Sequence, residues 1–582
     1  MITRRTLFAA ALGSVVDLRA QMASRGVTAT LRGKASGLPF DARLTDVAAS
    51  AGLTAPTIYG GVERNDYIIE AIGCGVAFFD YDNDGWLDIL VLSGTRWEGD
   101  PAGATNRLYK NNRDGTFRDV TEQAGLLRTG WHSGVTIGDY NNDGFEDIFI
   151  TGWPQNVLYR NNGNGTFTDV TREAGLLHDG ARWGTGCTFV DFDCDGNLDL
   201  FVSNYLKFDL KTVPRAGTDP SCNFKGVQIN CGPRGLLPET HCLYRSNGDG
   251  TFRDVSVSSG ISRATGSYGL TTVAADFDGD GWPEIYVACD STPSLLFKRR
   301  SDGTFAEVGM ESGVALNEDG AEQAGMGLGI GDFNLDGRLD ILKTHFTEDT
   351  PALYVNTRRG GFDDVTIKSG LGVETRYVSW GAAITDLDNN GWPDLFWVTG
   401  SVYPEVEKKL PQFPNRTPRV VFRNLGDGKF EELLDGAGPG VVAAHSSRGC
   451  AMGDFDNDGD MDFVIVNLNE PPSLLRNDVK GDGNWIKVKL NGVKSNRSAI
   501  GAKVLVRYGG KQQIQEVLGQ SSFLSVNDKR LHFGLGHEKT AGIEVRWPSG
   551  VRQSFEAVPA NHLITVDEVK GIVKSERFPA VL

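Results

Sequence analysis

The stretch Asp80-Tyr81-Asp82-Asn83-Asp84-Gly85-Trp86-Leu87-Asp88 is the first of seven copies of one loop. The other copies start at Asp139, Asp191, Asp276, Asp332, Asp386 and Asp454. Each copy has an oxygen-bearing side chain at its first, third, fifth and ninth positions and a glycine at its sixth. Ca²⁺ takes its ligands from carboxylate, amide and carbonyl oxygens, and glycine permits the sharp turn that brings alternate residues together. The repeat therefore predicts up to seven calcium sites.

The predicted ligands of each loop are its four oxygen side chains and the backbone carbonyl of its seventh residue. Asn or Glu replaces Asp at a few of these positions and remains an oxygen ligand. The full set is Asp80, Asp82, Asp84, Trp86, Asp88, Asp139, Asn141, Asp143, Phe145, Asp147, Asp191, Asp193, Asp195, Asn197, Asp199, Asp276, Asp278, Asp280, Trp282, Glu284, Asp332, Asn334, Asp336, Arg338, Asp340, Asp386, Asp388, Asn390, Trp392, Asp394, Asp454, Asp456, Asp458, Asp460 and Asp462.

An EF-hand, a metal-free turn and a transition-metal site all fit the loop less well. An EF-hand needs a bidentate Glu at its twelfth position and flanking helices. The twelfth position here is apolar or Lys343, and short apolar runs such as Ile89–Leu92 follow the loops, which is typical of strands. Asp and Asn also form turns without a metal, but that role does not require the same four positions to be filled in every copy. Transition metals favour His or Cys, and only Cys194 lies in a loop, at a non-ligand position.

The acidity of the chain is explained largely by these loops. The 582 residues carry a net charge of −17, and the loop ligands include 25 carboxylates. Seven bound Ca²⁺ ions would bring the net charge near −3. An acidic chain is also a poor partner for nucleic acid, which selects basic surfaces, so we expect no nucleic-acid binding.

The N-terminus has the pattern of an export signal. Arg4-Arg5 precedes the short apolar stretch Ala9–Val16, which predicts a signal peptide over residues 1–20. The arginine pair resembles a twin-arginine signal, although Leu7-Phe8 departs from the usual order, so the export route stays open. No other segment is long and apolar enough to span a membrane. We expect a periplasmic or extracellular monomer, where calcium is plentiful, with a cytoplasmic start as the alternative.

Export also permits disulfides. Of eight cysteines, Cys222, Cys231 and Cys242 cluster around one long insertion, and we predict a Cys222–Cys231 bridge, although sequence does not settle the pairing. Cys74 and Cys450 lie in apolar stretches and are predicted to be buried thiols.

A second motif recurs between the loops. Leu108–Thr121 is its first copy, and its Asp-Gly pair indicates a hairpin turn. One repeat thus holds about four strands, the size of a propeller blade. Leu44–Leu53 matches the tail of a repeat, and the chain after the seventh loop supplies only the front of one. We predict an all-β, seven-bladed β-propeller over residues 40–478, closed by the N-terminal strand, with six or eight blades as alternatives.

The pattern changes from about Gly483. Trp485–Leu490, Ala502–Arg507 and Ile543–Trp547 alternate apolar and polar residues. Such strands with one apolar face predict a small β-sandwich-like domain over residues 483–573.

These residues resemble known families. The loops are similar to the FG-GAP/VCBS repeats of integrin α-subunits and of many secreted bacterial proteins. Ser495–Ala502, Leu531–Gly536 and Val545–Gly550 resemble an ASPIC/UnbV domain. Together they resemble bacterial relatives of cartilage acidic protein. The resemblance implies extracellular, calcium-bound proteins linked to matrix or cell adhesion. The Phe-Gly and Gly-Ala-Pro motifs of the integrin repeats are missing, so the resemblance does not imply an integrin-like ligand.

No strong catalytic signature appears in the sequence. The glycine run Gly325–Gly331 precedes a loop rather than opening a helix, so it indicates inner strands crowding the ring axis. Residues six to nine positions before the loops predict a ligand-binding cluster at the channel mouth opposite the calcium loops, with blade-to-blade packing as the alternative. They are His132, Trp183, Tyr268, Trp380, His445 and Arg448.

Two functions remain open. The first is a calcium-stabilised binding or adhesion module for an extracellular glycan or protein, which we favour over catalysis. The second is an extracellular enzyme acting on a polysaccharide or small metabolite at the channel mouth. A propeller scaffold alone does not decide between them.

Overall fold

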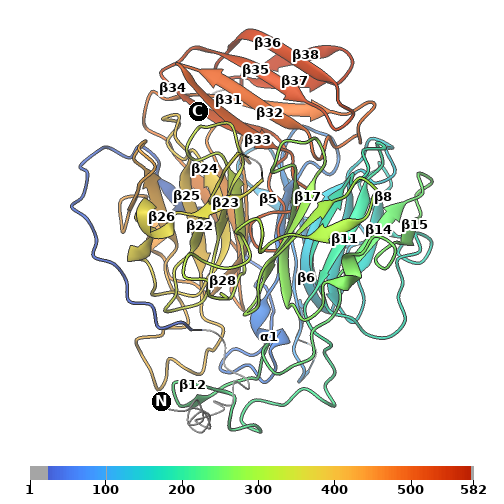
Figure 1. Cartoon of the computed structure of the whole chain (residues 1–582), viewed down its shortest axis with the longest axis vertical. Helices are drawn as coiled ribbons and strands as arrows, with labels where there is room; N and C mark the ends of the chain where they lie inside the picture. The colour runs from blue at the N-terminus through green and yellow to red at the C-terminus, as the bar shows by residue number, and fades with distance from the viewer. Residues whose placement is uncertain (1–23, 100, 359, 579–582) are drawn as a thin grey trace, which may run out of the picture.

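The computed structural model describes residues 24–99, 101–358 and 360–578, and the predicted signal peptide over residues 1–20 lies outside them. Within these ranges, seven four-stranded antiparallel sheets form a ring, and two further four-stranded sheets sit at one end of it (Figure 1). The innermost strands of neighbouring sheets contact one another around the full circle. The predicted all-β, seven-bladed propeller followed by a small sandwich-like domain is confirmed.

In each blade the strands are given from the axis outward. The first holds β2 (Val76–Phe79), β3 (Asp88–Val91), β4 (Arg107–Asn111) and β5 (Phe117–Asp119). The second holds β6 (Trp131–Gly138), β7 (Asp147–Trp153), β8 (Val157–Asn161) and β9 (Phe167–Asp169). The third holds β10 (Gly184–Val190), β11 (Asp199–Asn204), β14 (Cys242–Ser246) and β15 (Phe252–Asp254). The fourth holds β16 (Gly269–Ala275), β17 (Glu284–Cys289), β18 (Leu295–Arg299) and β19 (Phe305–Glu307).

The remaining blades follow the same order. The fifth holds β20 (Leu328–Gly331), β21 (Asp340–Lys343), β22 (Ala352–Asn356) and β23 (Phe362–Asp364). The sixth holds β24 (Ser379–Thr385), β25 (Asp394–Thr399), β26 (Val420–Asn424) and β27 (Phe430–Glu432). The seventh holds β28 (Ser447–Gly453), β29 (Asp462–Asn467), β30 (Ser473–Asn477) and β1 (Leu44–Asp46). Short pieces lie between blades: α1 (Ile69–Ile72), α2 (Thr366–Ser369), α3 (Pro439–Val442), η1 (Ile261–Arg263) and η2 (Leu371–Val373). The hairpin of β12 (Asn223–Phe224) and β13 (Val227–Gln228) lies in the connection between β11 and β14 of the third blade.

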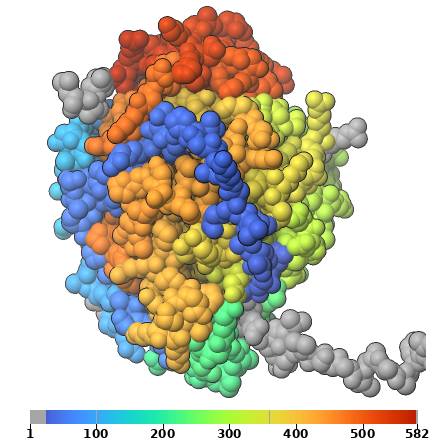
Figure 2. Space-filling view, turned by 90° about the vertical axis from the view of Figure 1, so that its left-hand side faces the viewer, coloured from blue at the N-terminus to red at the C-terminus, as the bar shows by residue number. Residues whose placement is uncertain are grey.

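The N-terminal strand closes the ring. β1 pairs antiparallel with β30, with Leu44 opposite Asn477 and Asp46 opposite Leu475. The seventh blade is therefore built from both ends of the propeller, as the sequence predicts, and the ring has no open edge between its ends. The chain before β1 runs along the outside of later blades (Figure 2). There Arg32 pairs with Glu432 at 2.6 Å and Ser36 bonds Glu431 of the sixth blade.

Small residues line the axis because the inner strands crowd there. A Cβ on Gly327 would lie 2.0 Å from the carbonyl oxygen of Trp380 in the next blade. A Cβ on Gly134 would lie 2.2 Å from that of Thr185. No side chain fits at such separations, which is the packing reason for the glycine run that ends in β20.

The two C-terminal sheets pack face to face. One holds β34 (Leu531–Gly536), β31 (Asn484–Asn491), β37 (Leu563–Asp567) and β38 (Gly571–Glu576). The other holds β33 (Lys511–Glu516), β32 (Lys503–Tyr508), β35 (Thr540–Arg546) and β36 (Arg552–Pro559). Ile486, Val504, Phe533 and Val545 are fully buried in one cluster, so alternate residues of the strands form the core.

The connection between β33 and β34 leaves the C-terminal sheets and fills the propeller channel. We call residues Gly519–Asp528 the plug segment. Val526 donates to the Val76 carbonyl at 3.0 Å, and Ser522 exchanges two backbone hydrogen bonds with Leu328. The Phe523 ring lies 4.9 Å from the Trp380 ring. These contacts place the plug segment among inner strands on opposite sides of the ring.

The plug segment bonds the innermost strand of every blade. Its partners are Val76 and Phe78 of β2, Val135 of β6, Cys187 of β10, Thr271 of β16, Leu328 of β20, Ala382 of β24 and Met452 of β28. The Gln520 side chain bonds three blades, because its Nε2 donates to Val135 at 2.7 Å and its Oε1 accepts from Cys187 at 3.1 Å and from Thr272 at 3.5 Å. The C-terminal sheets are therefore anchored through the propeller axis, and the channel holds protein rather than open space.

Candidate metal loops, channel and cavity

All seven loops place the first carboxylate in the same way. The sixth-position glycine donates its N–H to that carboxylate at 2.6–3.1 Å in every loop. In the first loop Gly85 has φ +88°, a conformation that L side chains rarely adopt, and it donates to Asp80 Oδ2 at 2.9 Å. The other oxygen, Asp80 Oδ1, accepts from the Asp84 N–H at 2.8 Å, so the turn fixes both oxygens of this carboxylate.

The ninth-position carboxylate ties each loop to its blade. Asp88 Oδ2 accepts from the Tyr81 N–H at 3.3 Å, and Asp88 Oδ1 accepts from the Asn111 N–H of β4 at 2.8 Å. The same pair of bonds recurs in the other loops that have Asp at this position. The loop is therefore fixed against the third strand of its own blade.

The third-position carboxylates carry the observation that points to a cation. Asp82, Asp193, Asp388 and Asp456 each have a buried Oδ1 with no hydrogen-bond partner among the described residues. In several loops the first, third and ninth carboxylates bring one oxygen each within 4.8 Å of one another, as in Asp80, Asp82 and Asp88. Buried oxygens normally have partners, and unpaired ones cost free energy. These acidic clusters can hold metal ions.

The pKa values of the ninth-position carboxyl groups also favour a cation in these loops. Burial, with repulsion from Asp80, raises the pKa of Asp88 to about 8. Burial, with repulsion from Asp139, raises the pKa of Asp147 to about 9. Burial also raises the pKa of Glu284 to about 8. Grouped buried carboxylates resist ionisation, and a cation at their centre would hold them ionised.

Basic side chains from the third strand approach some loops. Lys298 of β18 pairs with Asp278 and lies 3.3 Å from Asp280 and 3.6 Å from Glu284. Arg245 of β14 pairs with Asp193 at 2.6 Å. Lys110 of β4 pairs with Asp82 and lies 3.2 Å from Asp84 in the same way. These cations offset part of the loop charge and would compete with a metal for the same oxygens.

The C-terminal sheets place lysines against two of the loops. Lys487 of β31 pairs with Asp454 of the seventh loop, and both side chains are fully buried. Lys503 of β32 lies 3.0 Å from Asp276 of the fourth loop. Arg530 donates to the Asp454 carbonyl at 2.7 Å and to Asn457 Oδ1 at 2.6 Å. Ile514 of β33 also donates to Asp332 of the fifth loop at 3.2 Å, so the first carboxylates of three loops bond both the propeller and the C-terminal sheets.

Sequence reasoning missed these three cations and the plug segment. Lys487 and Lys503 alternate with apolar neighbours, which is typical of a solvent-facing position. Their true partners are loop carboxylates far away in the sequence. The one usable signal is the run Gly519–Ser525, which is rich in small and polar residues and too long for a tight hairpin.

The six residues predicted at the opposite channel mouth do not form one open surface. Arg448 and Trp380 lie together, with the guanidinium 4.1 Å from the indole centroid, and both are buried. Trp183 is fully buried and donates to Ser133 Oγ at 3.2 Å. Trp380 packs against Phe523 of the plug segment, and Trp183 packs against the Tyr205 and Phe208 rings.

The other three members lie apart. His132 is buried and bonds the Ser93 carbonyl at 2.9 Å, and burial lowers its pKa to about 4. The Tyr268 hydroxyl donates to the Leu236 carbonyl of the long insertion at 2.8 Å. His445 is half-buried and lies 2.6 Å from Glu470. A ligand role for all six residues stays a prediction.

Two family models match the sequence of this chain. FG-GAP-like repeats match residues 80–150, 139–202, 239–287, 276–343 and 332–397, and ASPIC and UnbV matches residues 492–573. Human cartilage acidic protein 1 is 29% identical over 335 residues, which cover 55% of this chain and 47% of that protein. The mouse protein is 26% identical over 518 residues, which cover 84% of this chain and 73% of that protein.

The chain is a homologue of cartilage acidic protein 1. It spans about half the length of the human relative in that match. Its FG-GAP-like repeats form the propeller, and its ASPIC and UnbV region lies in the C-terminal sheets and includes the plug segment.

Similar solved structures are more distant. An Agrocybe aegerita lectin that recognises non-reducing terminal N-acetylglucosamine has 18% identity and a TM-score of 0.35, covering 69% of this chain and 87% of that one. Trypanosoma rangeli sialidase has 11% identity and a TM-score of 0.34, covering 67% of this chain and 59% of that one. Likenesses at this level say nothing about what the FG-GAP-like propeller binds.

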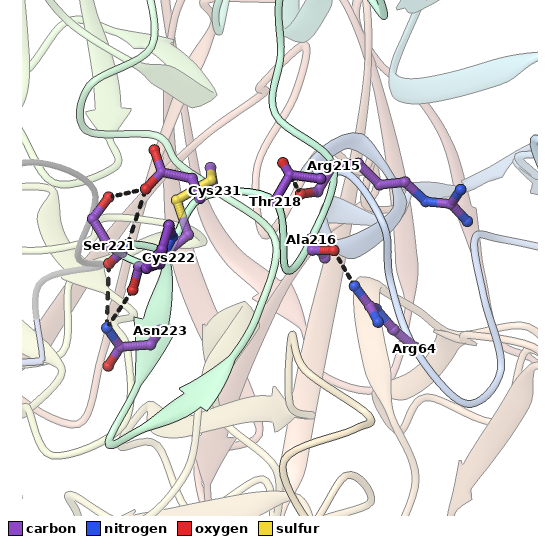
Figure 3. The surroundings of a disulfide bond; sticks show 10 residues. Arg64, Arg215, Ala216, Thr218, Ser221, Cys222, Asn223 and Cys231 are labelled. Carbon is purple, nitrogen blue, oxygen red and sulfur yellow. Dashed lines mark hydrogen bonds between the residues drawn. A yellow bond between two sulfur atoms is a disulfide. The ribbon is translucent and has the colours of Figure 1, made fainter.

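The insertion between β11 and β14 lies at the end of the propeller away from the ASPIC and UnbV sheets, where Figure 1 places β12. Cys222 and Cys231, the pair favoured from sequence, form a disulfide in it (Figure 3). Arg64 donates to the Ala216 carbonyl, which ties the insertion to the segment before α1 (Figure 3). The disulfide is consistent with export. Among the described residues, no helix has the length and apolar character needed to cross a membrane.

A cavity of about 570 Å³ opens at this same end of the FG-GAP-like propeller. Its walls are residues 59–70 before and within α1, residues 401–416 of the second insertion, and residues 446–469 of the seventh blade. Of the six residues predicted to bind ligand, only Arg448 lines it. Burial raises the pKa of Glu70, which also lines it, to about 7.

Proposed function

We propose that this protein is an exported, calcium-bound propeller that acts as a binding module for an extracellular glycan or protein. The buried, unpartnered third-position oxygens of four loops carry the calcium part of the proposal. Ca²⁺ prefers many oxygen ligands at flexible geometry, whereas Mg²⁺ prefers to keep several waters. The loops offer carboxylates, amides and carbonyls, which fits calcium.

The residues that would hold the ions are the oxygen side chains of the first, third, fifth and ninth loop positions and the seventh-position carbonyls. Bound calcium would neutralise clustered carboxylates that otherwise repel one another. Backbone N–H groups of the chain orient two of these carboxylates. The sixth-position glycine orients the first-position carboxylate, and a residue of the third strand orients the ninth-position carboxylate. The metal is thus proposed to stabilise the blades rather than to take part in a reaction.

Three observations support a binding role. Every inner strand bonds the plug segment, which cross-links the blades of the propeller. Long insertions, one of them cross-linked, are displayed at the end away from the calcium loops, and long loops on a rigid scaffold often bind ligands. A cavity lies beside them.

The test is a calcium count and a melting curve on the full chain. Elemental analysis after gel filtration should find several calcium ions per chain, and EGTA should lower the melting temperature, because a ligand that binds only the folded state stabilises it. The variant Asp82→Ala should lose one ion, whereas Asp114→Ala, in an exposed hairpin turn, should lose none. Calcium-free protein with an unchanged melting temperature in EGTA would refute the proposal.

A further inference from the structure

We propose that the cavity between residues 59–70 and 401–416 binds the end of a neutral glycan. This inference rests on the proposed binding function and gives it a site and a ligand class. Its volume of about 570 Å³ falls within the range of small-ligand pockets, roughly 300–1,000 Å³. The site differs from the channel-mouth cluster predicted from sequence.

The floor of the cavity is built rigidly around Arg448. Its guanidinium donates to the carbonyls of Ala71 at 2.9 Å, Ser447 at 2.8 Å and Ser401 at 2.8 Å, and it lies on the Trp380 ring. These carbonyls belong to α1, the seventh blade and the second insertion. One buried side chain therefore fixes all three walls, and a site fixed before binding loses less entropy when it binds.

Two asparagines fix the walls further. Asn469 accepts from Arg96 at 2.9 Å and donates to the Tyr59 carbonyl at 2.9 Å. Asn65 donates to the Val402 carbonyl of the second insertion at 3.1 Å. The cavity is therefore held by side-chain bonds between segments that are distant in the sequence, and it is not a gap between loose loops.

The charges of the lining select the ligand class. Glu63, Glu70 and Glu407 oppose Lys408, Arg416 and Arg448, so the formal charges cancel. With Glu70 protonated the lining would carry a single positive charge, far from what a polyanion requires. Charged ligands gain from a lining of strong opposite charge, and this lining carries at most one net charge.

Hydroxyl groups suit this lining because each one both donates and accepts hydrogen bonds. The exposed pair Lys408–Glu63 and the half-exposed pair Arg416–Glu470 supply donors and acceptors at the rim. Val62, Pro404, Pro411 and Leu468 supply apolar surface for the C–H faces of a sugar ring. A neutral, polyhydroxylated chain end satisfies both kinds of surface.

The experiment uses the full chain in calcium on an array of neutral, sialylated and sulfated oligosaccharides, followed by titration of the strongest neutral oligosaccharide. Val62→Trp places an indole in the cavity from an exposed position on its wall. Val257→Trp, at an exposed position on the third blade, is the matched control. Lys408→Ala removes a rim donor and serves as the second variant if Val62→Trp does not fold.

We expect neutral oligosaccharides to bind, Val62→Trp to weaken binding at least tenfold, Lys408→Ala to weaken it several-fold, and Val257→Trp to leave it unchanged. Binding that survives both cavity variants would overturn the site while leaving the binding function in place. Binding of acidic glycans alone, or of no glycan, would overturn the ligand class. Calcium counts and melting curves on the same samples show separately whether the calcium-bound propeller of the proposed function holds.

Discussion

Lys487 of the C-terminal sheets and Asp454 of the seventh propeller loop form an ion pair in which both side chains are fully buried. Removing one partner from such a pair leaves an uncompensated buried charge, which typically costs about 3–5 kcal/mol. Lys487→Met should therefore destabilise the calcium-free protein by about that amount. In calcium the loss should be smaller, because the metal would also hold Asp454.

Urea unfolding with and without calcium measures both values. Lys494→Met, which changes an exposed lysine of the same domain, is the control and should cost little. Equal losses for the two variants would show that the buried pair has no special role.

The raised pKa values of Asp88 and Asp147, about 8 and about 9, predict how stability depends on pH. A carboxyl whose pKa is higher in the folded than in the unfolded state adds stability below its unfolded pKa, and loses it as pH rises through the folded pKa. Calcium-free protein should therefore be more stable near pH 5 than near pH 8. Melting temperatures in EGTA across this range test the prediction, and a rise with pH would contradict it.

Calcium binding should release protons near neutral pH. Metal binding requires the ionised carboxylate, and Asp88, Asp147 and Glu284 hold protons until about pH 8–9 without it. Calorimetric titrations in two buffers of different protonation enthalpy should give different apparent binding enthalpies, and calcium affinity should fall as pH falls. Identical enthalpies in both buffers would rule out the linkage.

Lys298 should weaken calcium binding at the fourth loop, because its ammonium pairs with Asp278 and lies within 3.6 Å of Glu284. Lys298→Met should raise the affinity of this loop several-fold. Competition with a fluorescent chelator measures the change, and Lys368→Met, at an exposed position on α2, is the control. Weaker binding in Lys298→Met would mean that the lysine positions the loop instead of competing with the metal.

Phe523 should anchor the plug segment. Its ring is fully buried against Trp380, and truncating a buried Phe to Ala typically costs about 3–5 kcal/mol. Phe523→Ala should lower the melting temperature and speed amide exchange in inner strands of several blades. Phe523→Leu keeps most of the buried volume and should have a smaller effect; a change confined to the C-terminal sheets would argue against the anchoring role.

Local and repeated features could be predicted from the sequence. The loop repeat indicated the blade number, and Leu44–Leu53 indicated how the ring closes, because both depend on spacing along the chain. The plug segment could not be predicted, since its partners lie in all seven inner strands and its own residues resemble a surface loop. The role of Lys487 could not be predicted for a similar reason: strand alternation shows that its side chain leaves the sandwich core, but not that Asp454 lies on the other side.

The pairing of β1 with β30 determines when the seventh blade can form during synthesis. Leu44 emerges early in synthesis, but its partner Asn477 appears only after all other blades have been made. Until then β1 lacks its partner strand, and the plug segment that bonds all the inner strands is still missing. The molecule therefore reaches its stable form only when nearly the whole chain is present, so truncated products would carry unpaired strand edges and would be targets for aggregation or proteolysis.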